Sequence, residues 1–162
     1  LTSYEASVEG SPPLAKSLTR EATHWNDRLV ASSVHTLGTS ATVIGQMKWG
    51  GTAIENSAYL GVCKEQFPYL LNWLEKQIPV EGGGFQPGLL SVQDIALGCH
   101  VGYILNRPIG IGLKVDSFPK IQCLLERLDE RASFRNNPIL WWEPGVVGYA
   151  EDGVTPVYKD GH

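Results

Sequence analysis

One short stretch, residues 89–99, constrains the fold of this 162-residue chain more than any other, because it predicts the start of a buried helix. Ser91 is a favourable N-cap, since its hydroxyl can accept a hydrogen bond from the backbone N–H of Asp94. The Asp94 carboxylate can in turn accept from the N–H of Ser91, which makes a reciprocal capping box with Asp in the place of the more usual Glu. From residue 92 to residue 105 the side chains are almost all small or apolar, and a helix that is apolar on every side belongs in a protein core.

Two long helices are predicted before this central one. Apolar residues recur at spacings of three and four over residues 17–47, and a similar apolar face runs through residues 52–77. A Gly-Gly pair separates the two segments, so a short loop and an antiparallel helix pair are expected. In the first helix, Trp25 and Leu29 are expected to point inward. The inner face of the second helix is expected to carry Tyr59, Cys63, Phe67, Leu70, Leu71 and Leu74.

Several helix-breaking residues lie within or beside these segments. Gly38 and Gly45 each weaken the first helix by about 1 kcal/mol relative to Ala, so a bend or a break is expected there. Pro68 lacks a backbone N–H and predicts either a kink in the second helix or its division into two. Pro108 should end the central helix at about residue 106, and Pro119 should open a further helix.

The order of elements predicts the domain organisation. Successive helices without strand patterns between them indicate an all-α domain over residues 17–140. Residues 1–16 contain a Gly-Ser-Pro-Pro cluster and are interpreted as a linker or N-terminal tail. Residues 141–162 are rich in Gly and Pro and are interpreted as a C-terminal tail. In that tail Asp152 and Gly153 could turn a hairpin, although Pro156 argues against its second strand.

Charge and cysteine content exclude several classes of function. The net charge is −4 and no run of Lys or Arg is present, so neither nucleic acid nor an anionic membrane is expected as a partner. No apolar run reaches the roughly 18 residues of a membrane span. Three cysteines far apart in sequence favour a reducing compartment, the cytoplasm, over a disulfide framework. Cys99 and Cys123 lie in apolar helical stretches and are expected to be buried.

Few residues suggest chemistry. His24, Arg28, Ser32 and His35 share one face of the first helix, which is either the wall of a ligand cleft or a solvated polar face. Tyr103, with Trp141 and Trp142, either forms an apolar ligand wall or packs in the core. No Cys or His spacing fits a zinc site and no Gly-x-Ser-x-Gly elbow is present, so no metal ligand and no catalytic residue is predicted.

Two segments carry a resemblance to a known family. Residues 90–97, LSVQDIAL, resemble the capping-box segment of the central helix in the C-terminal domain of cytosolic glutathione transferases. Residues 118–134, FPKIQCLLERLDERASF, resemble the next helix of that domain and its closing turn, with Ala132 where the family more often has Pro. The resemblance extends over about residues 11–138, and its motifs are specific for the domain but not for a substrate.

The resemblance implies a helical bundle of about five to six helices, with two long antiparallel helices packed on a buried central helix. In that family a thioredoxin-like N-terminal domain binds and activates glutathione, and the residues before Gly10 are too few to supply it. The chain is therefore expected to bind no cofactor and to be inactive alone. Glutathione would be a co-substrate of a longer protein that carries both domains, while this domain would supply the hydrophobic electrophile-site wall and homodimer contacts.

The resemblance also gives the polar helix face a role, since in that family the first helix of the domain lines the cleft between the two domains. His24, Arg28, Ser32 and His35, together with Tyr103, would then be substrate-binding residues of the cleft wall, and Ser91 and Asp94 would be structural. The alternative is a free-standing interaction or assembly module without catalysis, because similar domains also occur attached to translation factors and synthetases. If the cleft is open in this chain, self-association or covering by the tail is expected.

Overall fold

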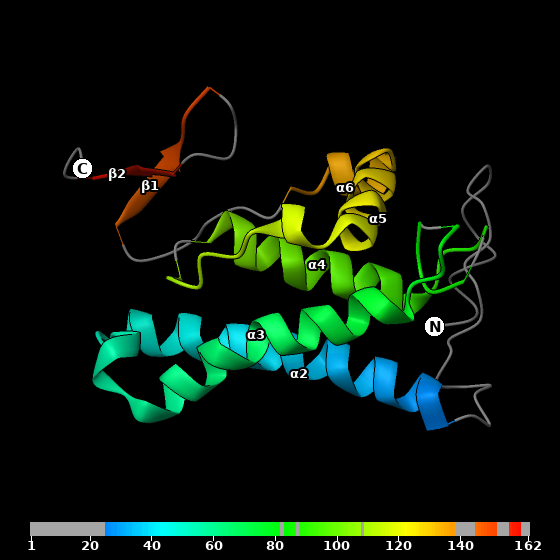
Figure 1. The fold of residues 1–162 in the computed structure, drawn as a ribbon. Coiled ribbons are helices and arrows are strands. Elements are labelled where there is room, and N and C mark those ends of the chain that lie inside the picture. Colours follow the sequence, from blue (N-terminus) through cyan, green and yellow to red (C-terminus); the bar gives the residue numbers. More distant parts are fainter. Residues whose placement is uncertain are drawn as a thin grey trace.

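The computed structural model describes residues 25–81, 83–86, 88–107, 109–138, 145–151 and 156–159. Within these ranges the side chains of Asn26 and Tyr149 are not described. The described chain is mostly helical, with one two-stranded sheet, so the predicted all-α character is confirmed (Figure 1). The α-helices are α2 (Trp25–Trp49), α3 (Ala58–Gln77), α4 (Val92–Asn106), α5 (Pro119–Asp129) and α6 (Ala132–Arg135).

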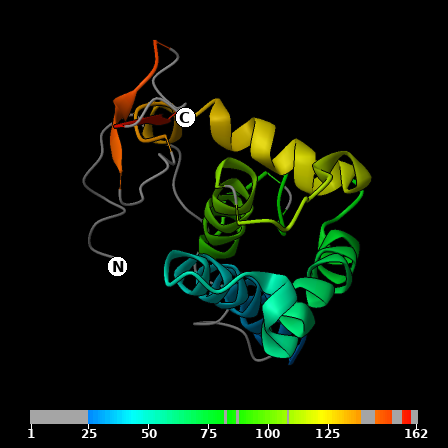
Figure 2. The same cartoon turned by 90° about the vertical axis from the view of Figure 1, so that its left-hand side faces the viewer.

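Four of these helices enclose the core. The long helices α2 and α3 lie against each other, α4 packs on α2, and α5 closes the arrangement by contacting both α4 and α3 (Figure 2). The buried residues of α2 recur at spacings of three and four, as predicted, and they face the buried residues of the other three helices. The core consists mainly of Val30, Val34, Leu37, Ala41, Ile44, Leu60, Phe67, Leu71, Leu74, Leu97, Val101, Ile104, Ile121, Leu124 and Leu128.

The expected break in the first helix does not occur, since α2 runs without interruption through Gly38 and Gly45. The reason lies in the packing of α4. A Cβ atom at Gly38 would lie 2.3 Å from the His100 imidazole, and one at Gly45 would lie 2.4 Å from the Tyr103 hydroxyl. The two glycines therefore allow α4 to approach α2 closely, and this packing offsets their low helix propensity.

α3 begins later than predicted and continues through Pro68 to Gln77. Residues Ile54–Asn56 form a separate 3₁₀ turn, after which the hydroxyl of Ser57 caps α3 by accepting from the N–H of Leu60. The assignment of Tyr59 to the inner face is wrong, because Tyr59 is 65% exposed and the adjacent Leu60 takes the buried position.

The start of α2 and the outer side of α4 also differ from expectation. Trp25 is 71% and Leu29 38% exposed, so neither is part of the core. Cys99 and Cys123 are exposed, contrary to the prediction, and only Cys63 of the three cysteines is buried. The helix α4 contacts α2 and α5, and Cys99 takes an exposed position on it.

The helix α5 is capped by another helix. Pro119 takes its first position, as predicted, but the N-cap residue Phe118 offers no side-chain cap. Instead the Glu75 carboxylate of α3 accepts from the backbone N–H groups of Lys120 and Ile121, each at 2.9 Å. The Lys120 ammonium group donates to the Ile78 carbonyl at 2.5 Å, so both partners tie the end of α3 to the start of α5.

The tail contains the predicted hairpin. Strands β1 (Val146–Tyr149) and β2 (Pro156–Tyr158) pair antiparallel, while the expected turn at Asp152 and Gly153 lies outside the described residues. Pro156, which was expected to weaken the second strand, takes its first position, where proline is tolerated. Val146 is among the buried hydrophobic residues and the half-buried Tyr158 packs against that group. Covering of the cleft surface by the tail stays a prediction.

We expect Glu75→Ala to lower the free energy of unfolding by about 2 kcal/mol. The change removes two hydrogen bonds to a carboxylate and leaves two N–H groups at the start of α5 without their acceptor. Urea denaturation measures the loss. The control is Glu65→Ala on the exposed side of α3, which should change stability by less than about 0.5 kcal/mol. Equal losses in the two variants would show that Glu75 does not act as a cap.

Candidate functional site

The start of α4 has the predicted capping geometry. The Ser91 hydroxyl accepts from the Asp94 N–H at 3.1 Å, and the Asp94 carboxylate accepts from the Ser91 N–H at 2.6 Å. The Ser91 hydroxyl also donates to the same carboxylate at 2.7 Å, and the Phe85 N–H donates to its other oxygen at 2.8 Å. Both residues are fully buried. The predicted structural role of Ser91 and Asp94 is therefore confirmed in its geometry.

The loop before α4 is held from two sides. A Cβ atom at Gly84, where φ is +147°, would lie 2.8 Å from the Asp94 carboxylate, so glycine is required there. From α5, the Arg127 guanidinium donates to the carbonyls of Gly83 at 2.5 Å and Leu89 at 3.2 Å. The glycine-rich loop is thus held in place between the helices. Asp94 binds its Phe85 N–H, and Arg127 binds its Gly83 and Leu89 carbonyls.

The predicted polar face of α2 is solvent-facing where it is described. Arg28, Ser32 and His35 are all exposed, and His24 lies outside the described residues. The hydroxyl of Thr36 donates to the Ser32 carbonyl, and the His35 Nε2 lies 3.5 Å from the Thr39 hydroxyl. The structure therefore leaves these side chains available to a partner, and their role as a cleft wall stays a prediction.

Tyr103 joins a line of polar and aromatic contacts along the α2–α4 interface. The Arg107 guanidinium lies over the Tyr103 ring at 4.8 Å and over the Trp49 ring at 6.0 Å, both measured to the ring centroid. The α4 residues of this line are spaced three and four apart and the α2 residues three, seven and four apart, so on each helix they share one face. We call this line the α2–α4 seam; its members are His35, Gly38, Gly45 and Trp49 of α2 and His100, Tyr103 and Arg107 of α4.

The titratable groups near the seam do not form a nucleophile and base pair. Partial burial lowers the pKa of His100, and the nearby charge of His35 lowers it further, which favours a neutral imidazole. Although Cys99 is an exposed residue, partial burial of its thiol raises the pKa, which favours the unreactive protonated form. The seam can thus offer hydrogen bonds, a cation and aromatic surface, but it offers no activated thiolate.

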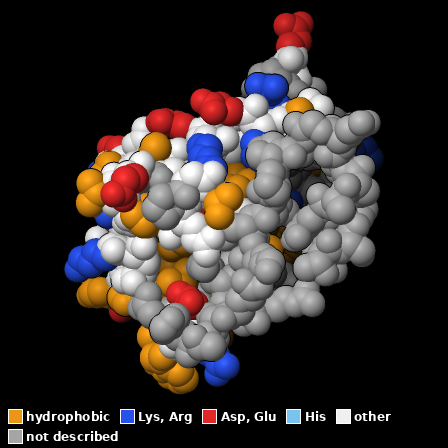
Figure 3. Space-filling view, turned by 90° about the vertical axis from the view of Figure 1, so that its right-hand side faces the viewer, with side chains coloured by type: hydrophobic (Ala, Val, Ile, Leu, Met, Phe, Trp, Pro, Cys, Tyr) orange, Lys and Arg blue, Asp and Glu red, His pale blue; other side chains and the backbone are white. Residues whose placement is uncertain are grey.

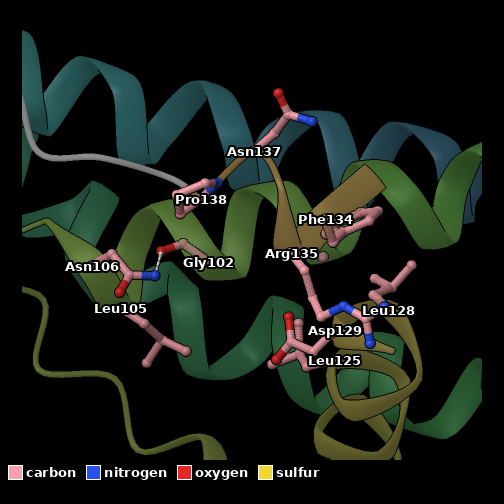
Figure 4. A pocket seen from close by; sticks show the side chains of 11 residues that line it. Gly102, Leu105, Asn106, Leu125, Leu128, Asp129, Phe134, Arg135, Asn137 and Pro138 are labelled. Atoms are coloured by element: carbon pink, nitrogen blue, oxygen red, sulfur yellow. Dashed lines mark hydrogen bonds between the residues drawn. The ribbon is translucent and has the colours of Figure 1, made fainter. Parts of the chain in front are cut away.

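Two hollows lie elsewhere on the molecule. A cavity of about 280 Å³ lies between α4, α5 and α6, with Leu105, Leu125 and Phe134 in its apolar wall (Figure 4). The Asn106 amide at its edge is bound back to the Gly102 carbonyl at 2.9 Å, as Figure 4 also shows. A larger groove of about 690 Å³ lies between α3 and residues 111–118. The sequence alone did not indicate either hollow, because each is formed by elements distant in sequence.

A patch of like charge on one face of the molecule, or a group of described His, Cys, Asp and Glu residues, would mark a further site. In the space-filling view of the end where α2 begins, described acidic, basic and hydrophobic side chains are interspersed (Figure 3). Within the described ranges, no group of three or more His, Cys, Asp or Glu side chains is arranged to hold a metal ion. No helix in the described part is long and apolar enough to span a membrane.

Comparison with models of protein families, with curated proteins and with solved structures finds no match to this chain. The class that the structure itself defines is an all-α helical domain with a small hairpin, built on the buried Ser91–Asp94 capping box.

We expect the capping residues to be unequal in their effect on stability. Ser91→Ala should cost about 1 kcal/mol, a typical N-cap loss. Asp94→Ala should cost about 3 kcal/mol, because it also leaves the buried Phe85 N–H without an acceptor. The double variant should lose less than the sum, since the two residues bond each other. Strictly additive losses in urea titrations would contradict the reciprocal geometry.

The His100 pKa predicts a pH dependence of stability. Because the folded-state pKa is lowered, the unfolded chain binds the proton more readily, so stability is complete above the unfolded value of about 6.5. Stability should fall as the pH drops through that value towards the folded pKa. Urea midpoints measured between pH 8 and pH 5 should show this fall, and His100→Gln should remove most of it. The control His35→Gln should reduce the fall only in part, and a fall unchanged in His100→Gln would contradict the assignment.

Proposed function

We propose that this chain is the helical C-terminal domain of a glutathione-transferase-like protein and that α2 forms a wall of the electrophile site. The observation that carries the proposal is the reciprocal Ser91–Asp94 capping box at the start of α4, in a helix that packs on one of two long paired helices. This box lies in the segment that carries the resemblance, and α5 with its following short helix lies in the second such segment. The order of two long helices, then α4 and then α5 supports the proposal, although only α2 of the two long helices packs closely on α4.

The exposed start of α2 supports a role in contacting another domain. Trp25 and Leu29 expose apolar surface on the helix that also presents Arg28, Ser32 and His35. Large apolar side chains at a polar face favour an interface, because covering them removes apolar area from water. Under the proposal, the covering partner is the thioredoxin-like domain of a longer polypeptide, which would bind glutathione and activate its thiol.

The described residues have separate tasks in this function. Arg28 and His35 would donate hydrogen bonds to a polar group of the electrophile or of glutathione. Tyr103 lies towards the other end of α2, against Gly45, and would offer an apolar ring there. This chain alone would bind no glutathione and would have no transferase activity, because the activating group lies in the other domain. Contacts between two copies of the longer protein would make the homodimer.

The test begins with the complete coding sequence, expressed as one protein. We expect retention on immobilised glutathione and conjugation of glutathione to an aryl halide, with neither activity in residues 1–162 alone. Arg28→Ala and His35→Ala in the longer protein should each raise KM for the electrophile about tenfold, which corresponds to one lost hydrogen bond of about 1.4 kcal/mol.

Lys76→Ala is the matched control, since Lys76 is an exposed cation that lies on α3 rather than on α2. Its kinetic constants should equal those of the unaltered protein. A reading frame that starts just before Leu1 would contradict the proposal. So would a longer protein that is not retained on immobilised glutathione.

A second candidate function is an interaction module without catalysis. It is favoured by the outer face of α3, where Tyr59, Val62 and Tyr69 are 65%, 52% and 77% exposed and follow one another at helical spacing. Such a row suits the apolar face of a partner helix. Two results together would favour this function over the first. The chain would bind one stoichiometric protein partner and lose it on Tyr69→Ser, and the longer protein would not be retained on immobilised glutathione.

A further inference from the structure

The groove between α3 and residues 111–118 has an apolar floor that belongs to the core. Phe67 of α3 and Phe118, which precedes α5, both line it and are almost fully buried. Its volume of about 690 Å³ lies within the range of about 300–1,000 Å³ that is usual for ligand sites. The floor is therefore rigid, since it is held by the same packing that holds the helices together.

One wall of the groove is a stripe of α3 that leaves a backbone acceptor without its usual donor. Gly61, Lys64, Pro68 and Asn72 line the groove and lie at spacings of three and four. Pro68 has no N–H, so the carbonyl of Lys64 lacks the hydrogen bond that it would receive inside an ordinary helix. Gly61 adds no side chain to this wall, and a Cβ atom there would meet nothing within 4 Å.

The opposite wall also presents backbone groups that have no hydrogen-bond partner among the described residues. Ile111, Gly112 and Leu113 line the groove in a segment without helix or strand. Their backbone N–H and carbonyl groups form no hydrogen bond with any described residue. An occupant that carries its own donors and acceptors at regular intervals would satisfy both walls, and a polypeptide backbone does so.

The shape and the charge of the groove narrow the occupant further. From Gly61 to Asn72 the α3 wall extends about 16 Å at 1.5 Å per residue, which matches about five residues of extended peptide at 3.3 Å each. Two lysines, Lys64 and Lys114, line it from opposite walls, and one carboxylate, Glu65, also lines it, so the charged side chains of the lining sum to +1. Neither lysine has an ion pair with a described residue. Lys64 is half-buried, so an anion placed beside it is screened less than at an exposed lysine.

We propose that this groove binds the C-terminal end of a protein, as an extended apolar peptide of about five residues with a free carboxylate. The carboxylate lies between the ammonium groups of Lys64 and Lys114, while apolar side chains pack on Phe67 and Phe118. The peptide N–H groups donate to the Lys64 carbonyl and to the carbonyls of Ile111 and Leu113. This site is separate from the α2 face and does not depend on the transferase proposal.

The experiment uses a pool of pentapeptides randomised over Ala, Val, Leu, Ile and Phe, labelled with fluorescein at the N-terminus. One pool ends in a free carboxylate and a matched pool ends in an amide. Fluorescence anisotropy with residues 1–162 should show at least about tenfold tighter binding of the acid pool, the effect of one charge-assisted contact. Chemical-shift changes in a ¹⁵N spectrum should include the amides of Ile111, Gly112 and Leu113.

Substitutions of the two lysines test the charge. Lys64→Met and Lys114→Met should each weaken binding of the acid pool by about threefold to tenfold and leave the amide pool unchanged. The control Lys76→Met, an exposed lysine on the same helix outside the groove, should leave both pools unchanged. Thermal melts of each variant confirm that folding is intact.

Three results would overturn the proposal. Equal binding of the acid and amide pools would show that no carboxylate is captured. Displacement of the acid pool by decanoate with a lower Kd than that of the peptides would show a site for alkyl acids, because such ligands need none of the backbone groups. No saturable binding of either pool up to about 1 mM would show that the groove has no peptide occupant.

Discussion

The buried carboxylate of Asp94 is the interaction on which the rest of the fold depends. An ionised group taken out of water is unfavourable by several kcal/mol unless hydrogen bonds replace its hydration. Asp94 receives three such bonds, two from Ser91 and one from Phe85, so its charge is satisfied by the start of its own helix and by the preceding loop. One side chain thereby fixes both where α4 begins and how the chain reaches it from α3.

The position of α4 then depends on close approaches at glycine. A Cβ atom at Gly98 would lie 2.2 Å from a methyl carbon of Leu128, just as those at Gly38 and Gly45 would meet His100 and Tyr103. These contacts bring α4 against α2 on one side and against α5 on the other. Because tightly packed interiors tolerate little added volume, the glycines specify the helix arrangement even though they weaken the helices that contain them.

Features set by nearby residues were predictable from the sequence, and features set by distant partners were not. The capping box and the buried α2 positions from Val30 to Ile44 follow from local geometry and were predicted correctly, whereas the inward positions predicted for Trp25 and Leu29 were wrong. The Glu75 cap of α5 could not be foreseen, because it joins residues 45 and 46 positions apart. Helical phase predicted that Arg28, Ser32 and His35 share a face of α2, because that depends on residues close in sequence. It could not predict that Arg107 lies over the rings of Tyr103 and Trp49, because Trp49 is distant in sequence.

The two surfaces with proposed functions differ in how they are connected to the core. The groove includes Phe67 and Phe118, which are core residues, so an occupant would bind a surface that exists only in the folded chain. By linkage, such an occupant stabilises the fold as its concentration rises above Kd. On the α2 face, Arg28, Ser32 and His35 are all exposed. A partner bound there would stabilise the fold mainly by covering the apolar surface of Trp25 and Leu29. A stability gain from a short peptide therefore indicates the groove, whereas a gain that requires a folded domain indicates the α2 face.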